Sequence, residues 1–198
     1  MFCKMVIKGI FGTGGIKMDD EVRQNWLYWK GALDVEPILN YASQASKTEA
    51  TTFGGDSKSH RRSEVAWLTG NEQIVNTIWA FMEEAHKSFR VQILRQKTEI
   101  QYTEYHATNR GKYDWHHDVD WNNPSGLDRK LSVTVQLSDP SEYEGGDFQF
   151  MEVEQPSEEA KTKGTVLMFP SYLQHRVTPV TDGVRKSLVL WFTGPRWQ

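Results

Sequence analysis

Apolar residues in the carboxy-terminal half of the chain recur in short segments typical of β-strands. From Phe89 onward these segments are rich in β-branched and aromatic residues: RVQIL, EIQYTEY, YDWHHDV, LSVTVQL, DFQFMEV, TVLMFP, HRVTPV and SLVLWF. Turn-forming residues separate them, including Gly111, Gly164 and the pair Gly145-Gly146. Eight short strands with little helix between them predict an antiparallel sandwich or barrel and argue against a parallel α/β fold.

The amino-terminal part carries signals for two helices. Asp34 is a candidate N-cap with Pro37 in the first turn, which predicts a helix over about 35–44. Residues 45–62 are rich in Ser, Thr, Gly and Lys and predict a long polar loop. Asn71 is the candidate cap of a second helix, in which one apolar stripe requires a partner surface; the stripe is formed by Ile74, Ile78, Phe81 and Ala85.

These elements predict a mainly β fold with flanking helices (α+β), organised as one domain over residues 1–198. Helices and a loop would support the fold over about 1–88, and the β core would follow over about 89–198. A chain of 198 residues with 38% hydrophobic residues is long enough for a single core.

Composition excludes several classes of partner and location. The net charge is -3 and no basic stripe is present, so we expect no nucleic-acid ligand. Cys3 is the only cysteine, which excludes an internal disulfide and favours a reducing cytoplasm. Lys4 and Lys8 interrupt the first apolar segment and no cleavage site follows, so we expect no signal peptide. No apolar run approaches the roughly 20 residues of a membrane span, and we expect a soluble protein.

A candidate metal site lies in the segment from Gly111 to Asp120. In a strand, Asp114, His116, Asp118 and Asp120 share one face while His117 points to the other. A His and an Asp two residues apart can bind one metal, although such a pair alone is more often a surface hydrogen-bonded pair. His175 begins a later strand after a polar turn and is the candidate third ligand. Two histidines and one carboxylate form the facial triad of non-haem Fe(II) oxygenases.

Arg185 adds a second functional signal to this pattern. It follows His175 by ten residues, and the intervening Thr181-Asp182-Gly183 predicts a turn, so the two strands should form a hairpin. A guanidinium group binds a carboxylate through two charge-assisted hydrogen bonds. A five-carbon diacid would bridge the metal and Arg185, and Ser187 on the same strand face could add a hydroxyl bond.

With these motifs the chain resembles the 2-oxoglutarate/Fe(II) dioxygenases of the prolyl 4-hydroxylase type, including bacterial and phage members and the related peptidyl hydroxylases. The matching segments follow the family order over about residues 26–196: 62–68, 101–105, 111–118, 129–140, 143–146, 163–175 and 180–195. The resemblance implies a double-stranded β-helix (jelly roll, cupin-like). It also implies hydroxylation of a substrate C–H bond, with Fe(II), 2-oxoglutarate and O2 as cofactors, ascorbate as reductant, and release of succinate and CO2.

Residue by residue, the resemblance makes His116, Asp118 and His175 the iron ligands and Arg185 the partner of the far carboxylate of 2-oxoglutarate. Tyr105 and Gln136 match positions that line the 2-oxoglutarate pocket, and Trp191 matches a position beside the metal. These three assignments are weaker, because aromatic strand residues are more often ordinary core residues. Many prolyl 4-hydroxylases carry Lys where this chain has Arg185, whereas arginine is usual in the related peptidyl hydroxylases.

The resemblance also implies a prolyl residue in a peptide as substrate, with Arg61, Arg62, Trp115 and Trp121 as candidate substrate contacts and the host cytoplasm as the location if a phage encodes the chain. A free amino acid or small metabolite is the other substrate class. The competing classes are a non-catalytic iron- and 2-oxoglutarate-binding module, a cupin-like metal protein and a zinc hydrolase. The intact ligand set, the presence of Arg185 and the lack of a candidate base argue against them.

Overall fold

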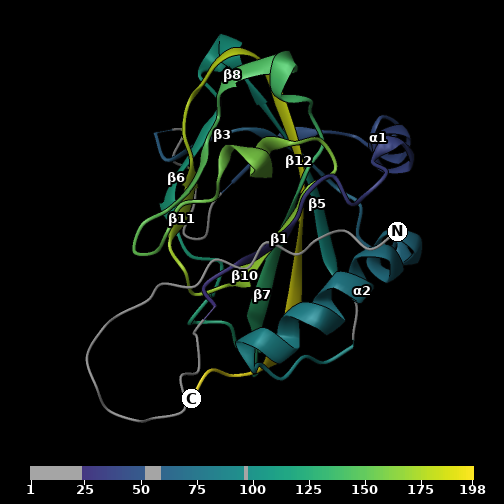
Figure 1. Cartoon of the computed structure of the whole chain (residues 1–198), viewed down its shortest axis with the longest axis vertical. Coiled ribbons are helices and arrows are strands. Elements are labelled where there is room, and N and C mark those ends of the chain that lie inside the picture. Colours follow the sequence, from purple (N-terminus) through teal and green to yellow (C-terminus); the bar gives the residue numbers. More distant parts are fainter. Residues whose placement is uncertain (1–23, 52–58, 96–97) are drawn as a thin grey trace.

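The computed structural model describes residues 24–51, 59–95 and 98–198, and its dominant feature is a pair of antiparallel β-sheets (Figure 1). The larger sheet has the strand order β1-β10-β7-β12-β5-β4-β2, and β8 adds to one end of β12. In sequence order these strands are β1 (Leu27–Trp29), β2 (Thr48–Glu49), β4 (Glu64–Trp67), β5 (Glu99–His106), β7 (Leu127–Gln136), β8 (Tyr143–Gly145), β10 (Val166–Pro170) and β12 (Val180–Pro195).

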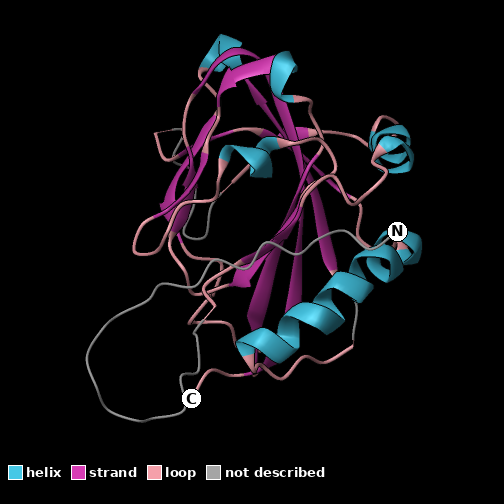
Figure 2. Cartoon of the chain, in the orientation of Figure 1, coloured by secondary structure: helices cyan, strands magenta, loops and turns pink. Residues whose placement is uncertain are grey.

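The smaller sheet has the order β3-β6-β11-β9. Its strands are β3 (Arg61–Arg62), β6 (Lys112–His116), β9 (Phe148–Phe150) and β11 (His175–Val177). Figure 2 shows the strands of both sheets in magenta and the helices in cyan. The predicted mainly β sandwich is confirmed, and it has the form of a double-stranded β-helix.

Two α-helices cover the outer face of the larger sheet. They are α1 (Glu36–Ala42) and α2 (Glu72–Phe89), and α2 crosses the sheet diagonally in Figure 1. Asn71 caps α2 as predicted, because its side chain accepts the Ile74 backbone N–H. The apolar face of α2 packs on a core that includes Leu131, Val133, Leu188 and Leu190 of the sheet. Short 3₁₀ turns complete the fold: η1 (Ala107–Asn109), η2 (Pro140–Glu142) and η3 (Glu158–Lys161).

The strand predicted for RVQIL is wrong. Arg90 ends α2 in the left-handed conformation with φ 53°, and residues 91–95 then run without strand pairing. Val91 and Ile93 pack against the core from an irregular segment. They are apolar because they contact the core, and not because they belong to a hydrogen-bonded strand. The amino-terminal part also contains the strands β1 to β4, where the sequence predicted only helices and a loop.

The hairpin predicted between His175 and Arg185 is also wrong. β11 pairs with β6 and β9, whereas β12 pairs with β5, β7 and β8, so the two residues belong to different sheets. Residues 181–183 lie inside β12, where the pairing with β8 shifts register between Val180 and Asp182. Gly183 has φ 67°, and a Cβ there would collide with the Glu142 carbonyl. The Asp-Gly pair therefore forms an irregularity in a strand and not a turn.

Some predictions fall on parts of the chain outside the described residues, namely those for Cys3, Lys4, Lys8 and the Gly54-Gly55-Asp56 part of the polar loop. Within the described ranges, neither α1 nor α2 has the length and apolar character to cross a membrane.

Candidate metal centre

Three predicted ligands converge where the smaller sheet faces the larger one. His116 and His175 are directly opposite each other in the β6–β11 pair. Asp118 follows the end of β6 and is fixed by a 2.9 Å hydrogen bond from its backbone N–H to the Ser171 carbonyl. Its Oδ1 lies 3.7 Å from His116 Nε2, and its Oδ2 lies 3.6 Å from His175 Nε2. All three ligand atoms lie within 4.8 Å of one another, so one metal ion can contact them together.

The strand predicted through Asp120 ends earlier, at His116. Asp118 therefore reaches the histidines because the chain turns after β6, and not because alternate residues of one strand share a face.

Backbone carbonyls orient both imidazole rings. His116 Nδ1 lies 2.7 Å from the Asp114 carbonyl, and His175 Nδ1 lies 2.9 Å from the Leu173 carbonyl. A carbonyl oxygen only accepts hydrogen bonds, so each Nδ1 carries the proton and donates it. In the neutral form of each ring this leaves the Nε2 lone pair facing Asp118, which is the tautomer that a metal ligand requires.

Burial, followed by repulsion from His175, lowers the pKa of His116 to about 3. The ring is therefore neutral at pH 7. Tyr113 stacks on it with the ring centroids 3.5 Å apart and the planes 12° apart, which restricts its rotation. A neutral imidazole held in one orientation is ready to bind a metal without first losing a proton.

Asp118 is charged although it is buried. Burial acts to raise its pKa, but the neighbouring His175 and His116, then Arg129 and the Ser132 hydroxyl, outweigh this and bring the pKa to about 2. Ser132 Oγ donates to Asp118 Oδ2 at 2.6 Å and lies 2.9 Å from Ser171 Oγ. The carboxylate thus has a fixed hydrogen-bond donor on one oxygen and an imidazole facing each oxygen.

These ligands line a cavity of about 200 Å³ between the two sheets, here called the metal cavity. The larger sheet supplies its opposite wall, where Arg185, Ser187 and Tyr105 all line the cavity. Arg185 is 4% exposed, its Nη1 lies 3.5 Å from Ser187 Oγ, and its guanidinium lies 5.6 Å from the centre of the Tyr105 ring. Among the described residues it has no carboxylate partner, so a buried positive charge faces the ligands across the cavity.

Comparison with known proteins agrees with this geometry. Residues 100–193 match the family model described as the 2OG-Fe(II) oxygenase superfamily. This segment is a 2OG-Fe(II) oxygenase domain. The matched segment contains all three converging ligands and Arg185.

Relatives of the oxygenase domain include a PKHD-type hydroxylase from Synechococcus sp. (strain CC9902), 37% identical over 79 residues, which are 40% of this chain and 35% of that protein. The chain thus spans about a third of the length of this relative. Among solved structures, a Pseudomonas putida prolyl-4-hydroxylase superposes with TM-score 0.66 at 17% identity, over 87% of this chain and 93% of that one. A prolyl hydroxylase from Trichoplax adhaerens, in complex with a hypoxia-inducible factor peptide, gives 0.65 at 15% identity over 85% and 84%.

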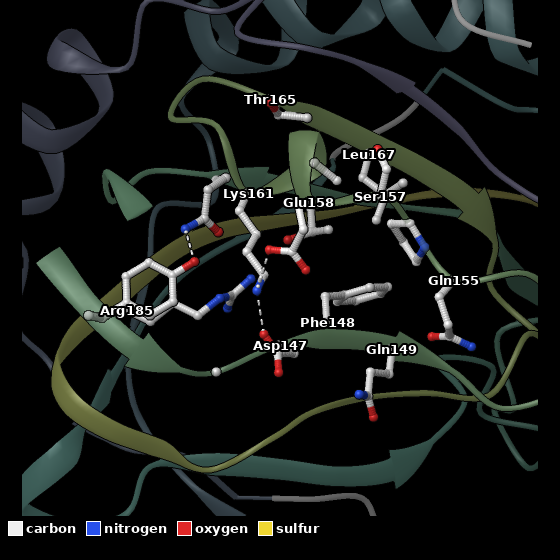
Figure 3. A pocket seen from close by; sticks show the side chains of 16 residues that line it. Asp147, Phe148, Gln149, Gln155, Ser157, Glu158, Lys161, Thr165, Leu167 and Arg185 are labelled. Atoms are coloured by element: carbon white, nitrogen blue, oxygen red, sulfur yellow. Dashed lines mark hydrogen bonds and ion pairs between the residues drawn. The ribbon is translucent and has the colours of Figure 1, made fainter. Parts of the chain in front are cut away.

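Gln136 does not line the metal cavity of the oxygenase domain. It lines an adjoining cavity of about 170 Å³, here called the rear cavity, where Figure 3 labels Arg185 among the lining side chains. Thr134, Phe148 and Arg185 line both cavities. The Gln136 amide donates to the Tyr143 hydroxyl at 2.9 Å. Lys161 pairs with Asp147 at 2.7 Å and with Glu158 at 2.9 Å beside the rear cavity. Gln136 therefore shares the rear cavity with Arg185 but not the metal cavity. It would contact a ligand only at the Arg185 end of the site.

A glycine makes room for Arg185 at this boundary. Gly146 has φ 62°, and a Cβ there would lie 2.9 Å from both Arg185 Cδ and Val180 Cγ2. The predicted turn pair Gly145-Gly146 thus has a packing function beyond the turn, because the backbone must approach the arginine side chain closely.

Trp191 lies in the wall of the metal cavity, with Arg129 over its ring at 3.8 Å and Trp67 at 6.2 Å between ring centroids. Sequence reasoning identified Trp191 but missed Arg129 and Trp67. Arg129 also pairs with Glu99 at 2.6 Å. Alternation along β7 gave no signal for Arg129, because the pairing with β12 shifts register between Phe192 and Thr193, opposite Leu131 and Arg129. Leu131 therefore packs in the core with α2, whereas Arg129 lines the metal cavity.

Of the four candidate substrate contacts, the structure places only Arg61 at the metal cavity. Arg62 points elsewhere and donates twice to the Arg110 carbonyl, at 3.2 and 3.0 Å. Trp115 packs under Arg176, 4.5 Å from its guanidinium. Trp121 is 54% exposed and bonds His117, outside the cavity lining. Strand alternation explains the separation of Arg61 from Arg62 and of His116 from Trp115.

A second cluster of possible metal ligands, formed by Glu64, Glu104 and His106, lies away from the cavity. Lys47 contacts the buried Glu104 at 2.7 Å, and the Tyr102 hydroxyl donates to it at 2.6 Å. The lysine ammonium already supplies the cation for this carboxylate, so the cluster is explained as a structural ion pair.

Proposed function

We propose that the chain is an Fe(II)- and 2-oxoglutarate-dependent oxygenase that hydroxylates a prolyl residue of a peptide. One observation carries the proposal: a two-histidine, one-carboxylate set faces a buried, unneutralised Arg185 across a single cavity. Two imidazole ligands and one carboxylate suit Fe(II) and leave coordination positions free for other ligands. The residues present therefore fit the metal.

His116, Asp118 and His175 would hold the iron, and Arg185 would bind the far carboxylate of 2-oxoglutarate with Ser187 and Tyr105 beside it. Bound iron and 2-oxoglutarate would supply the oxidising chemistry, with O2 as oxidant and ascorbate as the reductant that restores Fe(II). The protein would position these partners and exclude water from the cavity. The peptide substrate is supported by the prolyl hydroxylase neighbours, one of which is named as a peptide complex.

Oxidation of 2-oxoglutarate tests the first part of the proposal. The full chain, incubated with Fe(II), ascorbate and 2-oxoglutarate, should form succinate slowly, and faster with proline peptides that gain one oxygen atom. His175→Ala should lose both metal binding and succinate formation. His117→Ala is the matched control, because His117 adjoins a proposed ligand but bonds Trp121 outside the cavity. Tight metal binding by His175→Ala would refute the ligand assignment.

A further inference from the structure

Positively charged groups outnumber carboxylates around the metal cavity. Among the described residues, the guanidinium groups of Arg61, Arg129 and Arg185 line it, whereas Asp118 is its one carboxylate. Guanidinium groups remain charged at any pH that the protein experiences. Because a buried charge is costly unless a counter-charge compensates it, the balance of charge constrains what the cavity binds.

The ligands of the proposed function do not complete this balance. A divalent metal and a dianionic diacid have equal and opposite charges, so together they add nothing to it. Asp118 offsets one guanidinium, and Glu99 offsets Arg129 at 2.6 Å. One positive charge remains after the metal and the diacid are both in place.

The remaining positive charge is that of Arg61, because Arg61 lies far along the sheet from Arg185. Arg185 lies opposite Tyr105 in the β12–β5 register, whereas Arg61 bonds Gln101, four residues farther along β5. Four residues of strand extend about 13 Å. A diacid whose far carboxylate is bound by Arg185 does not place that carboxylate on Arg61, so Arg61 stays available for a second ligand.

The contacts of Arg61 fix the guanidinium without neutralising it. It is 8% exposed, its Nε donates to Ser63 Oγ at 2.9 Å, and its Nη2 donates to Gln101 Oε1 at 2.8 Å. Its Cζ lies 4.4 Å from the centre of the Tyr113 ring. Both hydrogen-bond acceptors are neutral, and most of its five N–H groups have no acceptor among the described residues. A carboxylate is the partner that matches a guanidinium held in this way.

Two indole rings of the same cavity provide an apolar surface near the charge. Trp67 is 52% exposed, lines the metal cavity and lies 6.2 Å from Trp191. Such a surface suits a compact apolar ring such as that of proline. We infer that the substrate presents a carboxylate next to its prolyl ring and that Arg61 binds this carboxylate. This inference rests on the proposed function and narrows its substrate class to acidic prolyl substrates.

Pairs of peptides that differ by one charge test the inference. A peptide with Pro-Glu and the same peptide with Pro-Gln are titrated into the full chain loaded with Mn(II) and 2-oxoglutarate, and hydroxylation is followed by mass with Fe(II). We expect the acidic peptide to bind roughly 10-fold or more tightly, as for a charge-assisted hydrogen-bonded pair. Equal binding of the two peptides would overturn the assignment of the carboxylate to an internal side chain.

Two further pairs distinguish the sources of the carboxylate. A peptide that ends in proline is compared with its amide, and free L-proline is compared with L-prolinamide. A charge preference in only one pair identifies an internal side chain, a peptide terminus or a free amino acid as the source. No preference in any pair would contradict the carboxylate assignment for all three sources.

Variants connect the preference to Arg61. Arg61→Gln should remove the preference for the acidic ligand, and Arg61→Lys should retain part of it. Arg62→Gln is the matched control, because Arg62 is adjacent but bonds the Arg110 carbonyl outside the cavity. A preference that persists undiminished in Arg61→Gln would overturn the inference. If 2-oxoglutarate is still oxidised without peptide, that result would leave the proposed function intact; loss of this oxidation in the unmodified chain would refute the function itself.

Discussion

Replacement of Ser132 by alanine would remove the hydroxyl that fixes the metal-binding carboxylate. Ser132 Oγ donates to Asp118 Oδ2 at 2.6 Å and also contacts Ser171 Oγ at 2.9 Å. All three side chains are 5% exposed or less, so water does not replace the lost hydrogen bond readily. The Ser132 hydroxyl is also one of the groups that lower the pKa of Asp118.

Two effects of this change can be separated. A buried charged acceptor that loses its donor costs about 1–3 kcal/mol of folding free energy. Loss of a hydrogen-bond partner of a metal ligand typically weakens metal binding by roughly 10- to 100-fold. We therefore expect Ser132→Ala to lower both the free energy of unfolding and the affinity for metal.

Calorimetric titration of Mn(II), together with urea unfolding of the metal-free chain, measures the two effects. Ser138→Ala is the matched control, because Ser138 is equally buried and bonds the Val184 carbonyl and the Lys186 N–H away from the metal centre. The control should lose stability but keep its metal affinity. Wild-type metal affinity in Ser132→Ala would refute the positioning role of Ser132.

Three other changes probe the neighbouring groups. Arg185→Gln should weaken 2-oxoglutarate binding by roughly 100-fold, the value of two charge-assisted hydrogen bonds, while calorimetry shows unchanged metal affinity. Gly146→Ala should also weaken 2-oxoglutarate binding because its Cβ would displace the Arg185 side chain, whereas Gly70→Ala, with φ 99° and open space around it, should only lower the melting temperature. Burial acts to raise the pKa of Glu104, but hydrogen bonds, first that of Lys47, lower it overall. A group with a lowered folded pKa stabilises above its unfolded pKa, so the destabilisation in Glu104→Gln should be full at pH 7 and disappear as urea unfolding is measured through more acidic pH; a difference independent of pH would contradict this.

Local patterns predicted the elements that depend on nearby residues. The cap at Asn71, the apolar stripe of α2 and most strands after Glu99 follow from periodicity and turn residues, and the structure confirms them. The strand predicted after Arg90 is wrong because the segment is apolar only where it packs on the core. Periodicity does not distinguish such an irregular segment from a strand. The short strands β1 to β4 were not predicted, because they form only by pairing with distant partners such as β10 and β5.

In the candidate site, too, local patterns predicted some features and distant contacts determined the others. The residue types and their spacing predicted which side chains converge, but not the path by which they meet. Asp118 approaches the histidines through a contact with Ser171, more than fifty residues away in sequence, and Arg61 enters the cavity from a strand of two residues. Such contacts depend on tertiary pairing, so no local signal in the sequence identifies them.

The location of His175 and Arg185 on opposite sheets leaves space between them for the proposed diacid. In a hairpin, neighbouring strands lie about 4.8 Å apart, which leaves no space for a ligand between their side chains. Facing sheets are about 10 Å apart, which leaves room for a metal and a short diacid. β12 pairs with β8 up to Gly183 and with β5 from Val184 onward, and Gly146 accommodates Arg185 at the end of the cavity. Space for the co-substrate therefore arises from the separation of the sheets, and the ten-residue spacing is the length of chain that crosses from one sheet to the other.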